Sequence, residues 1–244
     1  MKRSFSKIQS GKSGIFTKVL SGAFLALAAA SAQASTISFD SLDPNLFAGG
    51  DSFSEAGFNM TVVDKAGSGL AGAAINGSND FSCSIISCPT GNGSTYYAGL
   101  NDGGLSFNRN NNGGFVVKSL DYSFIAPVGG LIDFSVGKLV LTGTGMNNVT
   151  VQTTVDFSAQ VNGQFTFSNF NVGNAFSHTV LKQLDISACL YTVDGSCINP
   201  AGNQAQFALD NVNVAAVPEP STYAMMGLGL AGLAALARRR RNQA

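Results

Sequence analysis

The alternation of apolar and polar residues in the stretch 149–157 constrains the fold of this chain more than any other feature. Residues of one parity are apolar except for Thr153, and those of the other parity are Thr150, Gln152, Thr154 and Asp156. Successive side chains of a strand point to opposite faces of its sheet. The pattern therefore predicts a strand with one buried and one solvated face, which is typical of antiparallel sheets.

The same period of two recurs between Ser35 and the C-terminal tail, and no segment there has the 3.6-residue period of a helix. The segments that carry it are 36–40, 57–64, 91–100, 104–108, 115–126, 131–142, 164–170 and 180–191. Turns rich in Gly, Asn and Asp separate them. We therefore predict an all-β fold, an antiparallel β-sandwich of the jelly-roll type with about nine to eleven strands. It would occupy residues 35–216 as one domain.

The last predicted strand, 206–214, changes parity in its middle. It has four large apolar residues, two of each parity: Phe207, Leu209, Val212 and Val214. A β-bulge near Asp210 and Asn211 would bring all four to one face, because a bulge adds one residue to its strand. The stretch 67–79, by contrast, is small and polar, and we expect a loop there.

The N-terminus has the features of a secretory signal peptide. A region with five Lys or Arg residues precedes an apolar segment from Val19 to Ala30. Ala32-Gln33-Ala34 then forms a small-x-small cleavage site. We expect residues 1–34 to direct export through the Sec machinery, with signal peptidase cleaving after Ala34.

The C-terminal tail, residues 217–244, has three parts in order. Pro218, Glu219 and Pro220 form an extended, exposed motif, because proline fixes φ and lacks a backbone donor. The uncharged run 221–237 follows, and 17 residues make a helix of about 25 Å. This helix is shorter than the hydrocarbon core of a membrane, which is roughly 30 Å thick. We therefore predict a single transmembrane helix that anchors the chain in the inner membrane only transiently. A basic cluster sets its orientation: Arg238, Arg239, Arg240 and Arg241.

This tail resembles the PEP-CTERM sorting tail, in the sequence Val217-Pro218-Glu219-Pro220-Ser221-Thr222, the Gly/Leu/Ala-rich segment and the arginine cluster. The resemblance implies export by a Gram-negative bacterium and recognition of the PEP motif by an exosortase. It further implies that the tail is removed, that the mature protein is then released or attached at the cell surface, and that the protein is associated with exopolysaccharide and biofilm. Residues 206–210 (QFALD) are similar to the QFxxD signature of one PEP-CTERM subgroup. The alternative interpretation of the tail is an ordinary C-terminal membrane anchor.

The net charge of the predicted mature chain argues against nucleic acid as a partner. The whole sequence has 14 basic and 14 acidic residues, but nine of the basic ones lie in the signal peptide and the tail. Residues 35–217 therefore keep five basic residues against 13 acids, a net charge of −8. Such a domain lacks the basic patch that nucleic acid or an anionic membrane surface requires.

Four cysteines fall in two local pairs, Cys83 with Cys88 and Cys189 with Cys197. An even number of cysteines in an exported chain favours disulfides, and three pairings are open. We predict Cys83–Cys88 and Cys189–Cys197, since each pair brackets a short loop. The alternative is a single four-cysteine zinc site, for which these spacings are poor.

The sequence offers little for catalysis, and we predict that the protein is not an enzyme. His178 is the one histidine, and no nucleophile-elbow motif frames a serine. Glycoside hydrolysis needs two facing carboxylates, but Glu55 is the one glutamate of the predicted mature domain. The aspartates lie in turns or at strand ends, where they commonly cap loops.

Two binding sites are nevertheless candidates. Calcium takes oxygen ligands from Asp side chains and loop carbonyls, and jelly-roll binding modules often hold a structural calcium ion between the first and last strands. The corresponding ligands here are Asp40, Asp43 and Asp210, and no other cofactor is expected. For a glycan, the chain lacks tryptophan, and Tyr96-Tyr97 is the best candidate for an exposed aromatic platform.

These observations favour a non-enzymatic cell-surface or extracellular-matrix protein that an exosortase cleaves at the PEP motif. A carbohydrate-binding, lectin-like module is the first alternative, which an ordered calcium ion and an exposed Tyr96 or Tyr97 would favour. A secreted hydrolase is the second.

Overall fold

The computed structural model describes residues 34–79, 82–84, 86–126, 136–217 and 220–242. Residues 32–217 form one compact unit, whereas helix α3 (Pro220–Arg241) belongs to another. Almost all of the predicted signal peptide, residues 1–33, lies outside the described residues, as do Pro218 and Glu219 of the PEP motif.

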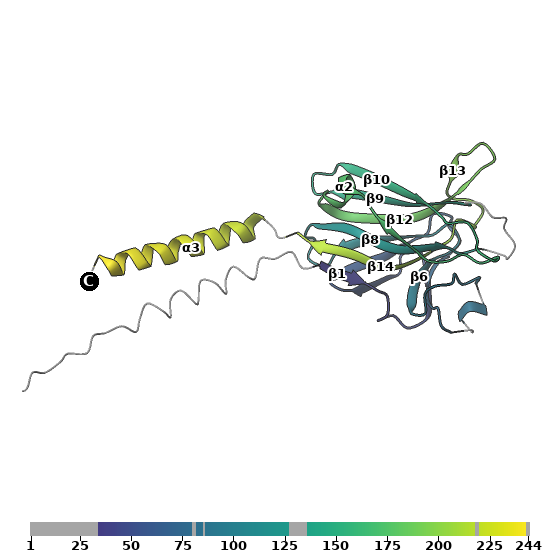
Figure 1. Cartoon of the computed structure of the whole chain (residues 1–244), viewed down its shortest axis with the longest axis horizontal. Helices are drawn as coiled ribbons and strands as arrows, with labels where there is room; N and C mark the ends of the chain where they lie inside the picture. The colour runs from purple at the N-terminus through teal and green to yellow at the C-terminus, as the bar shows by residue number, and fades with distance from the viewer. Residues whose placement is uncertain (1–33, 80–81, 85, 127–135, 218–219, 243–244) are drawn as a thin grey trace, which may run out of the picture. The chain divides into compact units, whose positions relative to one another are not determined.

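The fourteen strands of the described residues form one antiparallel network that is divided into two layers (Figure 1). The first layer, here called the first sheet, has the order β2-β5-β6-β14-β8-β11, with β1 also paired to β14. Its strands are β1 (Ala34–Ile37), β2 (Asn45–Ala48), β5 (Leu70–Asn76), β6 (Thr95–Gly99), β8 (Phe115–Phe124), β11 (Ser168–Asn171) and β14 (Phe207–Ala216).

The second sheet has the order β3-β4-β7-β12-β9-β10, and the short β13 pairs with the end of β12. Its strands are β3 (Ser52–Glu55), β4 (Phe58–Val63), β7 (Gly104–Arg109), β9 (Gly137–Gly145), β10 (Thr150–Asp156), β12 (Leu181–Tyr191) and β13 (Cys197–Ile198). One residue pair, Leu181 with Phe115, joins the two sheets.

The two sheets enclose the main hydrophobic core. The rings of Phe58 on β4 and Phe115 on β8 meet edge to face across the core, with their centroids 5.0 Å apart. The Tyr97 hydroxyl on β6 donates to the Gly104 carbonyl on β7 over 3.1 Å, which links the two sheets by a buried hydrogen bond. The predicted antiparallel β-sandwich is therefore confirmed.

Strand β14 confirms the predicted bulge. Its register against β8 shifts between Asp210 and Asn213, and Asn211 has a φ of +48°. The extra residue restores the parity of the strand, so its four large apolar side chains are all buried in the main core: Phe207, Leu209, Val212 and Val214. The bulge also leaves Asp210 buried at the point where the strand bends.

Strand β5 corrects the expectation of a loop at 67–79. Its residues are small because a ring lies against it: a Cβ at Gly72 would be 2.5 Å from the Tyr97 hydroxyl oxygen. Ala73 and Ile75 face the opposite side, where a second apolar cluster covers the outside of the first sheet. Small residues here reflect close packing, which a search for large alternating side chains does not detect.

The described residues contain few helices. A 3₁₀ turn, η2 (Ser82–Ser84), and a single turn, α2 (Asn174–Ser177), lie in the sandwich, and α3 begins at Pro220, the last residue of the PEP motif. Within the described part of the chain, no helix combines the length and the apolar character needed to cross a membrane. The predicted transmembrane helix is therefore not supported, since the uncharged part of α3 is short and contains polar residues and glycines.

Candidate functional site

The sorting tail starts immediately after the last strand of the sandwich. The Val217 N–H donates to the Gly114 carbonyl over 2.9 Å, so the sheet orders the chain up to the residue before Pro218. Pro220 is the first residue of α3, a favourable position because its missing N–H would have no partner in the first turn. The four arginines form the last turn, where they complement the negative end of the helix dipole.

Both predicted disulfides are present, Cys83–Cys88 and Cys189–Cys197, and none of the four cysteines is free. The second disulfide fastens β13 to the end of β12. The first closes the loop around η2, and Cys88 packs with Ile86 against the outer apolar cluster. The cysteines are thus structural, and the zinc alternative is wrong.

Tyr96 and Tyr97 do not form the predicted exposed platform, because both rings are fully buried. They point to opposite faces of β6: Tyr97 lies in the main core, and Tyr96 lies in the outer cluster, where Phe167 meets it edge to face at 5.3 Å. Burial raises the pKa of Tyr96 above that of a free tyrosine, and its hydroxyl has no hydrogen-bond partner in the described structure.

Asp210 is the centre of a polar cluster. It is 1 % exposed, and its carboxylate accepts hydrogen bonds from Asn92 Nδ2 (2.6 Å), Ser94 Oγ (3.2 Å) and the Asn211 backbone N–H (2.7 Å). Burial raises the pKa of Asp210 to about 6, the nearby charge of Asp40 adds to this effect, and the three hydrogen bonds oppose it.

Of the three predicted calcium ligands, Asp40 and Asp210 are therefore close enough to interact. Asp40 also accepts a hydrogen bond from the Thr95 N–H at 3.2 Å, whereas Asp43 lies exposed in the following turn. No group of three or more His, Cys, Asp or Glu side chains in the described residues is arranged to hold a metal ion. Oxygen ligands for calcium at this place would have to include Asn side chains or backbone carbonyls.

The residues considered for catalysis make structural contacts. Glu55 Oε1 accepts from the backbone N–H groups of Ser38 (2.9 Å) and Phe39 (3.2 Å), and Oε2 accepts from Ser41 Oγ (3.2 Å). Glu55 thereby holds the chain after β1, where Phe39 has a φ of +59°. His178 is exposed, and its Nδ1 bonds the Asn174 carbonyl of the same helical turn at 2.6 Å.

Asp102 lies in a turn and has a structural role that its local sequence does not indicate. Its fully buried carboxylate accepts three backbone hydrogen bonds, from Ala201 (2.8 Å), Asn203 (2.7 Å) and Ala205 (2.8 Å). These donors lie in the segment that leads into β14. Local sequence carries no signal for such a contact, because its partners are about 100 residues away.

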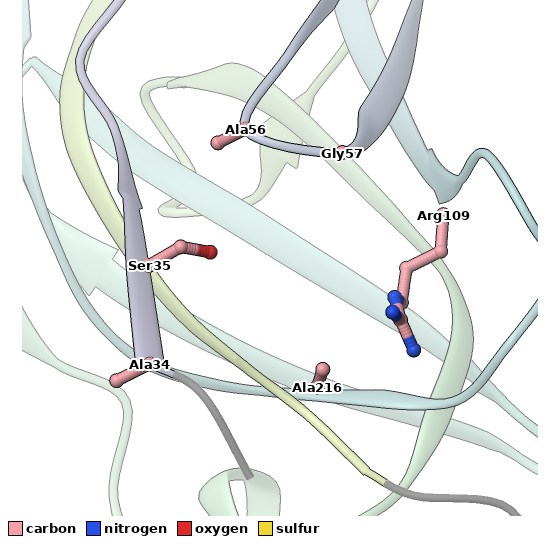
Figure 2. A pocket seen from close by; sticks show the side chains of 6 residues that line it. All are labelled: Ala34, Ser35, Ala56, Gly57, Arg109 and Ala216. Carbon is pink, nitrogen blue, oxygen red and sulfur yellow. The ribbon is translucent and has the colours of Figure 1, made fainter. Parts of the chain in front are cut away.

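A cavity of about 470 Å³ lies where β1 begins and β14 ends (Figure 2). Five of its lining residues are small and neutral, and Arg109 is the sixth: Ala34, Ser35, Ala56, Gly57, Arg109 and Ala216. The Ser35 hydroxyl and the Arg109 guanidinium extend into it from opposite sides (Figure 2). No carboxylate of the described residues pairs with Arg109.

The outward face of the second sheet carries a row of hydrogen-bonding side chains. The row crosses six adjacent strands in register and is here called the polar row: Ser52, Thr61, Ser106, Asp185, Thr142 and Gln152. Two contacts run along it, from Gln152 Nε2 to Thr142 Oγ1 (3.2 Å) and between the hydroxyls of Ser52 and Thr61 (3.0 Å). The residues between these positions on each strand point the other way, into the core, so the members of the row lie on the opposite face and are polar.

Comparison with known protein families identifies the C-terminal tail. Residues 216–241 match the PEP-CTERM protein-sorting motif, so the chain carries the sorting signal of exosortase substrates. The match covers the tail and includes only the last residue of the sandwich's last strand, Ala216. No curated protein matches the chain.

Solved structures with some similarity to the chain include several carbohydrate-binding modules. The xylan-binding domain CBM22-1 of Paenibacillus barcinonensis Xyn10C is 12% identical, covers 78% of this chain and 99% of its own, and gives a TM-score of 0.33. TmCBM61, solved with β-1,4-galactotriose, is 9% identical, covers 65% of this chain and 88% of its own, and also gives 0.33. Scores this low establish neither a shared fold nor a shared ligand.

Proposed function

We propose that this protein is an exported, non-catalytic component of the cell surface or extracellular matrix, delivered by its PEP-CTERM tail. The observation that carries the proposal is the match of residues 216–241 to the sorting motif. In this scheme the Sec machinery exports the chain across the inner membrane of a Gram-negative cell and signal peptidase removes the leader. An exosortase then recognises Pro218-Glu219-Pro220 and removes the tail.

The position of the motif supports this order of events. Because Val217 is hydrogen bonded to the sheet, the motif follows the folded domain directly in the sequence. The non-catalytic part of the proposal draws on Glu55 and His178, which both make local structural contacts. The mature domain would be a jelly-roll sandwich of the QFxxD subgroup that resides among exopolysaccharide.

The test is replacement of the motif's carboxylate. In the native host, Glu219→Ala should leave export intact and block tail removal, so that the precursor accumulates in the membrane fraction. Asn242→Ala, beyond the arginine cluster, is the control and should be processed normally. Immunoblots of membrane and extracellular fractions measure both, and normal processing of Glu219→Ala would refute the proposal.

A second candidate function, carbohydrate binding, is favoured by the polar row. Apart from Ser106, which is buried, the row offers hydroxyl, amide and carboxylate groups as donors and acceptors to a polyhydroxylated chain, on strands spaced by about 4.8 Å. We expect a Thr142→Val, Asp185→Asn double variant to lose retention on immobilised exopolysaccharide from the host. The control is Thr36→Val on the first sheet. Equal retention of all three proteins would exclude the polar row as a binding surface.

A further inference from the structure

The cavity at Arg109 differs from the rest of the domain in its charge. The predicted mature chain has a net charge of −8, yet this cavity contains one cation and no acid. Arg109 Nη1 donates to the Gly114 carbonyl at 3.4 Å, a long contact, and no other hydrogen bond involves the guanidinium in the described structure. Since a guanidinium has five N–H donors, most of them are available to a ligand.

The turn after β7 packs closely against the guanidinium. Arg109 is the last residue of β7, and the turn after it returns at Gly113, where a Cβ would lie 2.7 Å from Nη1. A side chain at position 113 would therefore displace the guanidinium. The opposite wall is formed by β1, with the Ser35 hydroxyl directed into the cavity (Figure 2). No described residue is hydrogen bonded to that hydroxyl.

We propose that this cavity binds the carboxylate of a uronate sugar, with Arg109 as the carboxylate ligand and Ser35 as a partner for a sugar hydroxyl. A guanidinium binds a carboxylate through two parallel hydrogen bonds, which a neutral sugar cannot form. The volume of about 470 Å³ lies within the range of small-molecule sites and exceeds what a bare anion needs. The small lining residues leave that volume open. The inference rests on the proposed function, since an exopolysaccharide matrix is the source of such sugars.

The experiment titrates the full-length protein, purified in mild detergent, with D-glucuronate, D-galacturonate, D-glucose and acetate by isothermal titration calorimetry. We expect saturable binding of at least one uronate and none of glucose. Arg109→Gln should weaken uronate binding about 10-fold or more, as expected for loss of a charge-assisted pair. Arg109→Lys should retain part of the affinity. The control is Lys138→Gln on β9, which lies outside the cavity and should bind like the wild type.

A second variant tests the cavity without changing Arg109, in case the Arg109 variants do not fold. Ala216→Leu keeps the guanidinium and fills the cavity, so it should also lose uronate binding while its circular dichroism spectrum stays that of the wild type. The proposal would be overturned if the wild type did not bind uronate, or if Arg109→Gln bound uronate with unchanged affinity. It would also be overturned if acetate bound as tightly as uronate. Those results would not affect the sorting function, because processing of Glu219→Ala tests it separately.

Discussion

Asp102 is expected to be the residue on which the segment before β14 most depends. The carboxylate is buried and is the acceptor for the N–H groups of Ala201, Asn203 and Ala205. Asp102 has a φ of +61°, a conformation that Asn adopts at lower cost than Ala. Asp102→Asn therefore keeps the turn and the shape of the side chain but removes the charge. It also places the side-chain NH₂ group, a donor, next to backbone N–H groups that need an acceptor.

The magnitude follows from the exposure of the three donors. A buried hydrogen bond to a charged group contributes about 1.5–3 kcal/mol. Ala205 is fully buried, so the whole contribution of its hydrogen bond is lost. Ala201 is half-buried and Asn203 is exposed, so water can replace the carboxylate as the acceptor for their N–H groups. We expect a loss of about 3–5 kcal/mol for Asp102→Asn, which lowers Tm by roughly 6–20 °C for a domain of this size. Asp102→Ala should lose about 1 kcal/mol more from backbone strain.

The measurement is thermal and urea unfolding of the full-length protein with its disulfides intact, followed by circular dichroism. Asp43→Ala is the matched control, because this exposed aspartate has no hydrogen bond in the described structure and its loss should change stability by less than about 0.5 kcal/mol. If Asp102→Asn unfolds within about 1 kcal/mol of the wild type, the three hydrogen bonds do not contribute as argued.

The remaining predictions concern Asp210, whose pKa is raised to about 6 from 3.8. Because the folded protein binds this proton more tightly than the unfolded chain, the free energy of unfolding should fall as the pH rises from about 4 to about 6 and level off above. The expected decrease is on the order of 1–2 kcal/mol after allowance for solvent near the cluster, and Asp210→Asn should abolish it in unfolding experiments across this pH range. If the cluster holds calcium, about 1 mM Ca²⁺ should raise the Tm of the wild type at pH 7 and leave the Tm of Asp210→Asn unchanged. This concentration is roughly in the range of extracellular calcium sites. An equal rise of Tm in both proteins would exclude Asp210 as a ligand.

The strands with large alternating side chains could be predicted from the sequence, because their pattern reports directly which face is buried. The bulge in β14 was predictable for the same reason: Phe207 and Val212 have opposite parity, and a single inserted residue is the smallest change that buries both. Strand β5 was missed because its inward positions are occupied by Gly and Ala. Their size is explained only by Tyr97, which the sequence places about 25 residues further on.

The candidate sites were harder to predict than the strands. Adjacent aromatic residues in a strand point to opposite faces, which suggested one exposed ring in the Tyr96-Tyr97 pair. The first sheet, however, has an apolar cluster on its outer face as well, under the loop of the Cys83–Cys88 disulfide, and Tyr96 is buried there. Arg109 and Asp102 likewise carry no local signal, because their surroundings come from segments distant in the sequence.

The two ends of the sandwich would allow the predicted processing at both termini without loss of the folded domain. Strands β1 and β14 are antiparallel neighbours, and Ala34 pairs with Ala215. The predicted cleavage after Ala34 therefore removes one terminal residue of β1 from the ladder, and cleavage beyond Val217 removes none of β14. The pairs from Ser35–Val214 to Ile37–Val212 survive both events. If both cuts occur as predicted, the first removes Ala34 from the lining of the cavity that contains Arg109 while the core stays intact, and uronate affinity measured before and after processing would report the change.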